Sequence, residues 1–584
     1  MKIEPIFFVM IPMTFMVVYT GIGVKTEANQ KLNQRIARII PFSIFLGVSF
    51  AAYGNLLFNT GLYGDDIGLL LAYQRMGVVG IDQFLGWSRP FSPWLYQILI
   101  PIIRNTLWIY QFLLICLRAV CGWLVYRVIE SVDKKVKILG FFSGLLCVVY
   151  PGFTQQAHAL HYLLHFTVLA LLLLSLLMMG KASWEIDNRK RFLFYAFSVF
   201  LTGIHFWLEY FAGIEALRFL LLIMLLKKSQ SGDHLLRRFL RQWLPFGCVF
   251  AFYLIWRIWI FHPTYPPITL FNRLHGMGTG EVSEFISRFM LYGYTGGVAS
   301  WIHPFRLLIE NIPFVWWICI FGAVLSSAVI YFLVSQYPYG KTRLAVWWKW
   351  VACGALTIFA GAIPLVVSDT PVSLDFPWDR TTLCFLVGSC LAVGGTVMMI
   401  PKKLRAIVMV IFLGSAIAYQ NLYGLDYRRD WRRMCRIMAE LKREAPAITP
   451  GTLILYEALP IKYYSANSIN GLVNWMYNPV GRGSEEQYKV FQISERLGNV
   501  LPALEPGIPI QHGGFVGSTS QVILIVADEE GGVAIAVSAD DIPENIWNNN
   551  ILKAAQLSRM EFFQASDARF EADIPIFNSC PQEP

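Results

Sequence analysis

The sequence has few charged residues for its length. Only 15% of its 584 residues are charged, whereas 56% are hydrophobic, and the mean hydropathy is +0.50. Soluble domains carry about 25% charged residues, so this composition excludes a soluble globular protein and indicates a polytopic membrane protein. The net charge of +10 does not predict a nucleic-acid partner, because the basic residues fall in short clusters between apolar runs.

Motifs for thiolate, disulfide and phosphate chemistry are also missing. The chain has ten cysteines and no CxxC pair, and eight of the ten lie inside apolar runs as small packing residues. The other two, Cys435 and Cys580, lie in the polar C-terminal part and do not predict a disulfide framework. There is no glycine-rich phosphate loop, no internal repeat and no Asn-x-Ser/Thr site. A thiolate metal centre is therefore not expected.

Apolar runs of the length that crosses a bilayer, about 20 residues, recur along the chain. Basic clusters such as 134–137 and 189–191 fall in alternate connections between these runs, which marks one side as cytoplasmic. The predicted segments are 6–24, 39–60, 105–127, 138–151, 159–180, 192–210, 213–226, 243–261, 312–334, 345–367, 381–400 and 404–421.

The predicted fold class is a polytopic α-helical membrane protein with about twelve transmembrane helices and a small C-terminal extracytoplasmic α/β domain. Residues 1–38 supply an extra N-terminal membrane helix and a cytoplasmic linker. Residues 39–423 form the transmembrane domain, with outer loops 61–104 and 262–304. Residues 424–584 form the α/β domain. An arginine-rich helix and three strands are predicted there, at 426–444, 452–456, 521–526 and 532–537.

Two adjacent carboxylates, Asp65 and Asp66, follow the end of an apolar run in the sequence Tyr63-Gly64-Asp65-Asp66. Ionisable groups near the bilayer are costly unless they are paired, hydrated or used, so this pair predicts a functional site. The alternative is a solvated turn, which Gly64-Asp65 also suits. Downstream, Arg89 precedes a proline and could bind a phosphate through its planar guanidinium, or it could snorkel or pair with Asp82.

Histidines and further charges collect on the same outer side. His158, His161 and His165 have the spacing i, i+3, i+7, which on a helix places them on one face. The HExxH arrangement is missing, which favours a hydrogen-bonding face under a polar substrate over a metal site. His205 and Glu209 are spaced i, i+4 at the outer end of one helix, where a carboxylate could contact sugar hydroxyls.

Three more charged residues fall near this outer side. Arg257 lies close enough to the surface to approach an anionic group. Asp379 and Arg380 begin the helix that follows Pro377, so Arg380 is expected to point toward the outer cavity unless Asp379 or Asp375 pairs with it.

Several short motifs together resemble the GT-C superfamily of membrane glycosyltransferases, and more narrowly its prokaryotic members related to lipopolysaccharide and protein O-mannosyltransferases. The sequence departs from these relatives at Ser88, where they have glycine, and it has no WWDYG-like motif, which disfavours transfer to asparagine. The residues that carry the resemblance are Tyr63-Gly64-Asp65-Asp66, Ser88-Arg89-Pro90, Trp207-Leu208-Glu209-Tyr210-Phe211, Glu215-Ala216-Leu217-Arg218 and Trp378-Asp379-Arg380.

The resemblance implies a sugar donor on a polyprenyl phosphate, presented from the membrane, and an acceptor that is an extracytoplasmic glycan, lipid or protein. Asp65 would then be the general base, and Asp66 would orient it or bind a divalent cation such as Mg²⁺ or Mn²⁺; no cofactor is certain, and the sequence leaves the need for a metal open. The departing phosphate needs positive charge, which Arg89, Arg380, Arg257 or His262 could supply.

Two other functions stay open. A transporter or flippase for lipid-linked saccharides would also have many helices, but inverted repeats and charges at mid-membrane would be expected of it. A non-catalytic assembly protein for such saccharides is the third candidate. In each case the predicted location is the plasma (inner) membrane, with several spans and with the site and the C-terminal domain outside the cytoplasm.

Overall fold

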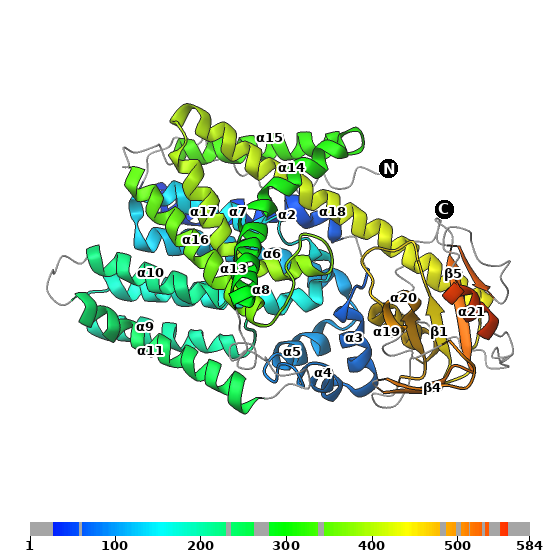
Figure 1. Ribbon diagram of the computed structural model, residues 1–584. Helices are drawn as coiled ribbons and strands as arrows, with labels where there is room; N and C mark the ends of the chain where they lie inside the picture. The colour runs from blue at the N-terminus through cyan, green and yellow to red at the C-terminus, as the bar shows by residue number, and fades with distance from the viewer. Residues whose placement is uncertain are drawn as a thin grey trace. The chain divides into compact units, whose positions relative to one another are not determined.

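The computed structural model is mostly helical, with a small sheet near the C-terminus (Figure 1). The chain forms two compact units, each built from separate parts of the sequence. Unit 1 comprises 1–58, 110–156 and 162–424, and unit 2 comprises 59–109, 157–161 and 425–584. The structure describes residues 27–57, 61–228, 235–261, 279–336, 344–478, 486–497, 504–512, 514–527, 532–536 and 549–558.

Unit 1 is a helical bundle. Three of its helices also contribute to unit 2: α6 and α8 begin there, and α18 ends there. The main helices are α2 (Glu27–Tyr53), α6 (Leu107–Val132), α7 (Lys137–Val148), α8 (Ala159–Trp184), α9 (Asn188–Thr202), α10 (Gly213–Lys228), α11 (Leu235–Ile255), α13 (Thr279–Tyr294), α14 (Ser300–Glu310), α15 (Ile312–Gln336), α16 (Leu344–Val367), α17 (Leu386–Met399) and α18 (Lys402–Glu444).

Within the described residues, six helices are long and apolar enough to cross a membrane. They coincide with six of the twelve predicted segments, so the membrane class is supported, whereas the number of spans is not confirmed. Among the other predicted segments, α7 has 12 residues, α9 has 15 and α10 has 16, and 6–24 lies outside the described residues. The six are α6, α8, α15, α16, α18 and the segment Trp378–Met399.

Helices α16 and α17 approach each other closely through glycines. A Cβ added at Gly354 would lie 2.5 Å from the backbone nitrogen of Ala392 and 2.6 Å from the carbonyl oxygen of Gly388. Small residues let helix backbones approach in this way inside membranes, where packing rather than the hydrophobic effect holds helices together. The glycines therefore set the distance between these two helices.

Unit 2 combines short helices with the sheet. Helices α3 (Asp65–Met76), α4 (Val78–Leu85) and α5 (Pro93–Ile103) come from its first part. The sheet order is β2-β1-β5-β6, with β1 parallel to both neighbours and β6 antiparallel to β5. Its other elements are β1 (Leu453–Tyr456), α19 (Ala466–Tyr477), β2 (Lys489–Gln492), α20 (Ile493–Arg496), the hairpin β3 (Pro509–His512) with β4 (Phe515–Ser518), β5 (Val522–Ala527), β6 (Val533–Ala536) and α21 (Asn549–Leu557).

The sheet has its own apolar core. Leu453, Leu455, Val522 and Leu524 are fully buried, and Ile551 of α21 packs into the same cluster. The predicted strands 452–456, 521–526 and 532–537 correspond to β1, β5 and β6, whereas β2 and the β3–β4 hairpin were not predicted. The predicted helix 426–444 is the second half of α18, which continues without a break from the apolar run before it.

Cys435 corrects one expectation from the sequence. It is disulfide-bonded, although the two cysteines of the polar part did not predict a disulfide, and the eight cysteines in apolar runs are free. Spacing in the sequence could not show this, because the bond depends on the fold rather than on a local motif.

We expect the substitution Gly354→Ala to lower the stability of the protein by about 1–3 kcal/mol, the cost typical of overpacking a close interface. Thermal unfolding of the full chain in detergent would measure the change. Gly203→Ala is the matched control, because a Cβ at Gly203 meets nothing within 4 Å. An equal effect of the two substitutions would contradict the role given to the α16–α17 contact.

Candidate functional site

Gly64 shapes the start of α3, where the acidic pair lies. Its φ angle is +52°, a backbone conformation that glycine adopts without strain and other residues rarely do. A Cβ at this position would lie 2.7 Å from Nδ1 of His158, so a side chain would also collide with that imidazole. Glycine is therefore required here by both the turn and its neighbour.

Asp66 is buried and holds the start of α8. Its side chain is 3% exposed, and its carboxylate accepts hydrogen bonds from the backbone N–H groups of Leu160 (3.2 Å) and His161 (2.7 Å). These N–H groups belong to the first turn of α8 and have no acceptor within that helix. Asp66, which belongs to α3, therefore caps α8. Burial raises the pKa of Asp66 well above its usual value, and the two N–H groups oppose that rise.

Asp65 faces the other way and is accessible. Its side chain is 54% exposed, and its Oδ2 lies 3.5 Å from Nδ1 of His161, whose side chain is 13% exposed. The backbone of His161 is fixed at both ends, because its N–H donates to Asp66 and its carbonyl oxygen accepts from the Tyr96 hydroxyl at 2.8 Å. Asp66 thus positions His161, which lies beside Asp65.

An aromatic cluster supports the acidic pair. The ring of Tyr63 lies 5.5 Å from that of His158, 5.1 Å from Tyr427 and 5.4 Å from Tyr464, between ring centroids. Its hydroxyl donates to the carbonyl oxygen of Tyr427, and the Tyr464 hydroxyl donates to the carbonyl oxygen of Leu62. The segment before Asp65 is therefore tied to α18 and to the loop before α19, all within unit 2.

Arg89 belongs to the same neighbourhood. It is partly buried between α4 and α5, and its charge acts on the Tyr96 hydroxyl together with the charges of Asp65 and Asp66. Unit 2 therefore contains five of the predicted site residues, Asp65, Asp66, Arg89, His158 and His161, and one that was not predicted, Tyr96. A tyrosine in an apolar helix resembles an interfacial aromatic, so no pattern in the sequence indicated a role for it.

Asp379 and Arg380 lie in unit 1 and play different parts. The Asp379 side chain is fully buried and accepts hydrogen bonds from the backbone N–H (2.9 Å) and hydroxyl (2.7 Å) of Thr154 and from the amide of Gln155. Its carboxylate therefore holds the loop before α8. Arg380 is partly buried, with its guanidinium 5.0 Å from the centre of the Trp378 ring. The polar run 154–156 between two apolar segments could have indicated this anchoring contact.

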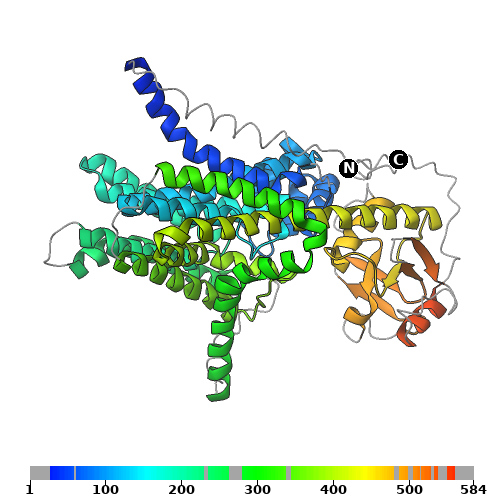
Figure 2. The same ribbon diagram turned by 90° about the horizontal axis from the view of Figure 1, so that it is seen from above.

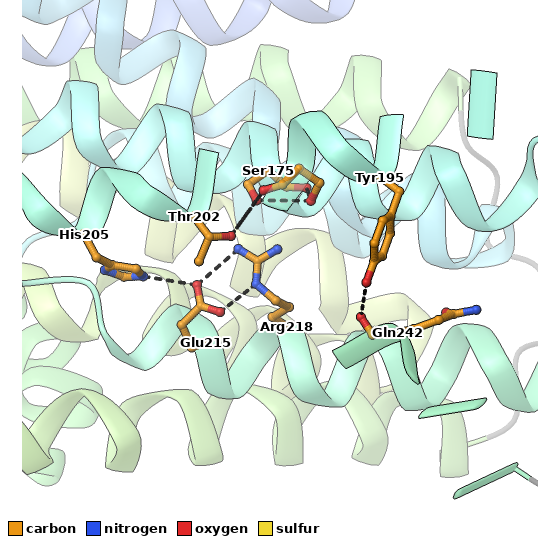
Figure 3. A network of polar contacts seen from close by, with 8 residues as sticks. Ser175, Tyr195, Thr202, His205, Glu215, Arg218 and Gln242 are labelled. Carbon is orange, nitrogen blue, oxygen red and sulfur yellow. Dashed lines mark hydrogen bonds and ion pairs between the residues drawn. The ribbon is translucent and has the colours of Figure 1, made fainter. Parts of the chain in front are cut away.

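The expectation that His205 and Glu209 lie together at the outer end of one helix is wrong. Helix α9 ends at Thr202 and a 3-10 turn follows, so these residues do not share a helix face. His205 instead lies 3.1 Å from Glu215, through Nε2 and Oε1, and Arg218 binds the same carboxylate with two nitrogens at 2.7 and 3.1 Å (Figure 3). Glu209 lies 3.9 Å from Arg257, between Oε1 and Nη2, at an ion-pair distance.

The three outer-loop histidines also do not form one helix face. His158 precedes α8 and lies against Tyr63, and His161 lies against Asp65. His165 belongs to unit 1, where its ring packs 4.9 Å from that of Tyr210. His262 lies outside the described residues.

A divalent cation does not fit the acidic pair. Both oxygens of Asp66 are occupied by backbone donors, which leaves Asp65 as the accessible carboxylate. In the parts of the chain that the structure describes, no three His, Cys, Asp or Glu side chains come together as a metal site requires. The idea that Asp66 binds a cation is therefore replaced by its role as a helix cap.

Comparison with known proteins finds a loose structural likeness and no sequence match. No protein-family model matches the chain, and no curated protein matches it in sequence. Among solved structures, the oligosaccharyltransferase of Archaeoglobus fulgidus, in complex with Zn and sulfate, is similar with a TM-score of 0.35 and 13% identity. The match covers 76% of this chain and 63% of that one. A likeness this loose does not identify the family, and nothing below depends on it.

We expect Asp66→Ala to destabilise the protein by about 2 kcal/mol, because it removes a helix cap and leaves buried N–H groups without an acceptor. Thermal unfolding of the purified full chain would detect the loss. Asp82→Ala removes an exposed carboxylate of the same unit and serves as the control. If Asp66→Ala were as stable as the control, Asp66 would not be the cap described here.

Proposed function

We propose that this protein is a membrane glycosyltransferase of the GT-C type, which moves a sugar from a polyprenyl-phosphate donor to an extracytoplasmic acceptor. The observation that carries the proposal is the accessible carboxylate of Asp65, held beside His161 by a buried partner, Asp66. Enzymes that deprotonate a hydroxyl need a positioned base within reach of the substrate, and a carboxylate can serve as that base. The motif resemblance supplies the substrate class.

The chemistry assigned to Asp65 is that of a general base. The acceptor hydroxyl gives its proton to the Asp65 carboxylate while its oxygen attacks the anomeric carbon of the donor sugar. The bond between that carbon and the phosphate oxygen breaks, and the phosphate leaves with the electron pair. His161 orients Asp65 through the 3.5 Å contact, which makes it a positioning residue.

The leaving phosphate gains negative charge and needs a cation nearby. We assign this role to Arg89, because it belongs to the same unit as Asp65 and its charge acts on the same tyrosine hydroxyl. A guanidinium binds phosphate oxygens through two parallel hydrogen bonds. Arg257, Arg380 and His262 stay predictions from the sequence.

The disulfide at Cys435 supports an extracytoplasmic location for the site. Disulfides persist in oxidising compartments such as the bacterial periplasm or the cell surface and are rare in the cytosol. Cys435 and Asp65 belong to the same compact unit, so both should lie on the same side of the membrane. This side is the one opposite the basic clusters of the sequence, in agreement with the rule that cytoplasmic loops carry the excess of positive charge.

We expect Asp65→Asn to lower glycosyl transfer by about 10²–10⁴-fold, the range that general bases contribute, with unchanged thermal stability. In the native host, deletion followed by complementation with the variant should leave the envelope glycan, lipid or protein without its sugar. The lipid-linked donor should accumulate. Asp82→Asn is the matched control. Normal glycosylation with Asp65→Asn would favour a flippase or a non-catalytic assembly protein instead.

We expect His161→Gln to lower transfer by a smaller factor than Asp65→Asn and to change the pH profile of the rate, because Asp65 loses an ionisable neighbour. A rate measured across pH with membranes that contain the variant would test this. A purely structural role for His161 would lower the rate equally at every pH and leave the shape of the profile unchanged.

A further inference from the structure

The second half of α18 carries a group of exposed arginines on one face. Arg429, Arg432 and Arg433 are exposed and follow the spacing i, i+3, i+4, so they share one face of the helix. The opposite face is buried in unit 2 through Trp431 and Met434, which are at most 2% exposed. Figure 2 shows this part of α18, in yellow, lying along one side of the domain that holds the sheet. We call the three residues the arginine stripe.

Neighbouring carboxylates do not neutralise the stripe. Asp426 accepts hydrogen bonds from the ammonium group of Lys462 and the hydroxyl of Tyr463. Asp430 attracts Arg433 electrostatically, but it is buried, and its two oxygens accept the backbone N–H groups of Lys462 and Tyr463. Among the described residues, no carboxylate lies within ion-pair distance of any arginine of the stripe. Three guanidinium groups therefore face outward with their charge available.

The place of the stripe along the helix indicates its partner. The run 406–425 of α18 has 20 residues without a charge, which is the length that a bilayer core requires of a helix. With a rise of about 1.5 Å per residue, Arg429 lies about 6 Å and Arg433 about 12 Å beyond the end of that run. The headgroup layer is about 5–8 Å thick, and long arginine side chains reach back toward it.

We propose that the arginine stripe binds the phosphate groups of anionic phospholipids in the leaflet from which α18 emerges. Arginine forms paired hydrogen bonds with phosphate oxygens, and basic groups next to a membrane helix attract anionic lipids. The stripe would fix the height of unit 2 above the membrane. This role is separate from glycosyl transfer and does not require it.

The test measures lipid binding by the full-length protein. Wild type and the triple variant Arg429→Gln, Arg432→Gln, Arg433→Gln are titrated in detergent with phosphatidylglycerol or phosphatidylcholine, and bound lipids are counted by native mass spectrometry. We expect phosphatidylglycerol affinity to fall by up to about fivefold for each arginine removed, with phosphatidylcholine unaffected. A charge-matched control, Arg443→Gln, Lys462→Gln, Lys553→Gln, removes three exposed cations of unit 2 and should bind as wild type does.

Other outcomes would overturn the proposal. Equal phosphatidylglycerol binding by wild type and the stripe variant would contradict the proposal. An equal loss of affinity in the charge-matched control would also contradict it. A stripe variant that loses binding of soluble polyphosphate but keeps phosphatidylglycerol would show that the partner is a soluble polyanion. If the triple variant does not fold, phosphatidylglycerol binding by the wild-type protein is measured at increasing salt concentration. The affinity must fall as salt rises, because salt screens exposed charges.

Discussion

The hydrogen bonds of the Asp66 carboxylate to the first turn of α8 are the contact on which the candidate site depends. Residues 65 and 66 are adjacent, and neighbours on a helix point in directions about 100° apart. When Asp66 turns inward to the N–H groups of Leu160 and His161, Asp65 must turn outward. The same bonds set the place of His161, so the accessible carboxylate and its imidazole neighbour are both consequences of one buried cap.

Two other carboxylates in the chain have hydrogen-bond partners within the protein and contrast with Asp65. In unit 1, Asp379 is fully buried and bound by Thr154 and Gln155, and Glu215 is bound by His205 and Arg218. These two carboxylates make their hydrogen bonds inside the protein, as buried polar groups generally do. They hold loops and helices together. Asp65 differs because half of its side chain is exposed, which leaves it free to meet a substrate.

The sequence predicted those features that arise from composition and local pattern. Hydrophobic length located six long apolar helices, and short continuous apolar runs located β1 and β5. The pair Asp65-Asp66 was recognised because two charges beside an apolar run are unusual. The sequence could not separate their roles, since the donors to Asp66 come from residues about 95 positions away. For the same reason it missed Tyr96, whose partner His161 is 65 positions distant.

The errors have a common physical origin. The spacing of His158, His161 and His165 was interpreted as one helix face, but α8 starts only at Ala159, because Asp66 caps it there. His205 and Glu209 were placed on one helix by their spacing, although α9 ends before them at Thr202. Charges at Asp426 suggested a boundary, yet α18 continues through them, because Arg429, Arg432 and Arg433 face outward while Trp431 and Met434 pack inward. Helical spacing predicts a shared face only for residues that lie in the same helix. The ends of these helices are set by contacts with distant parts of the chain.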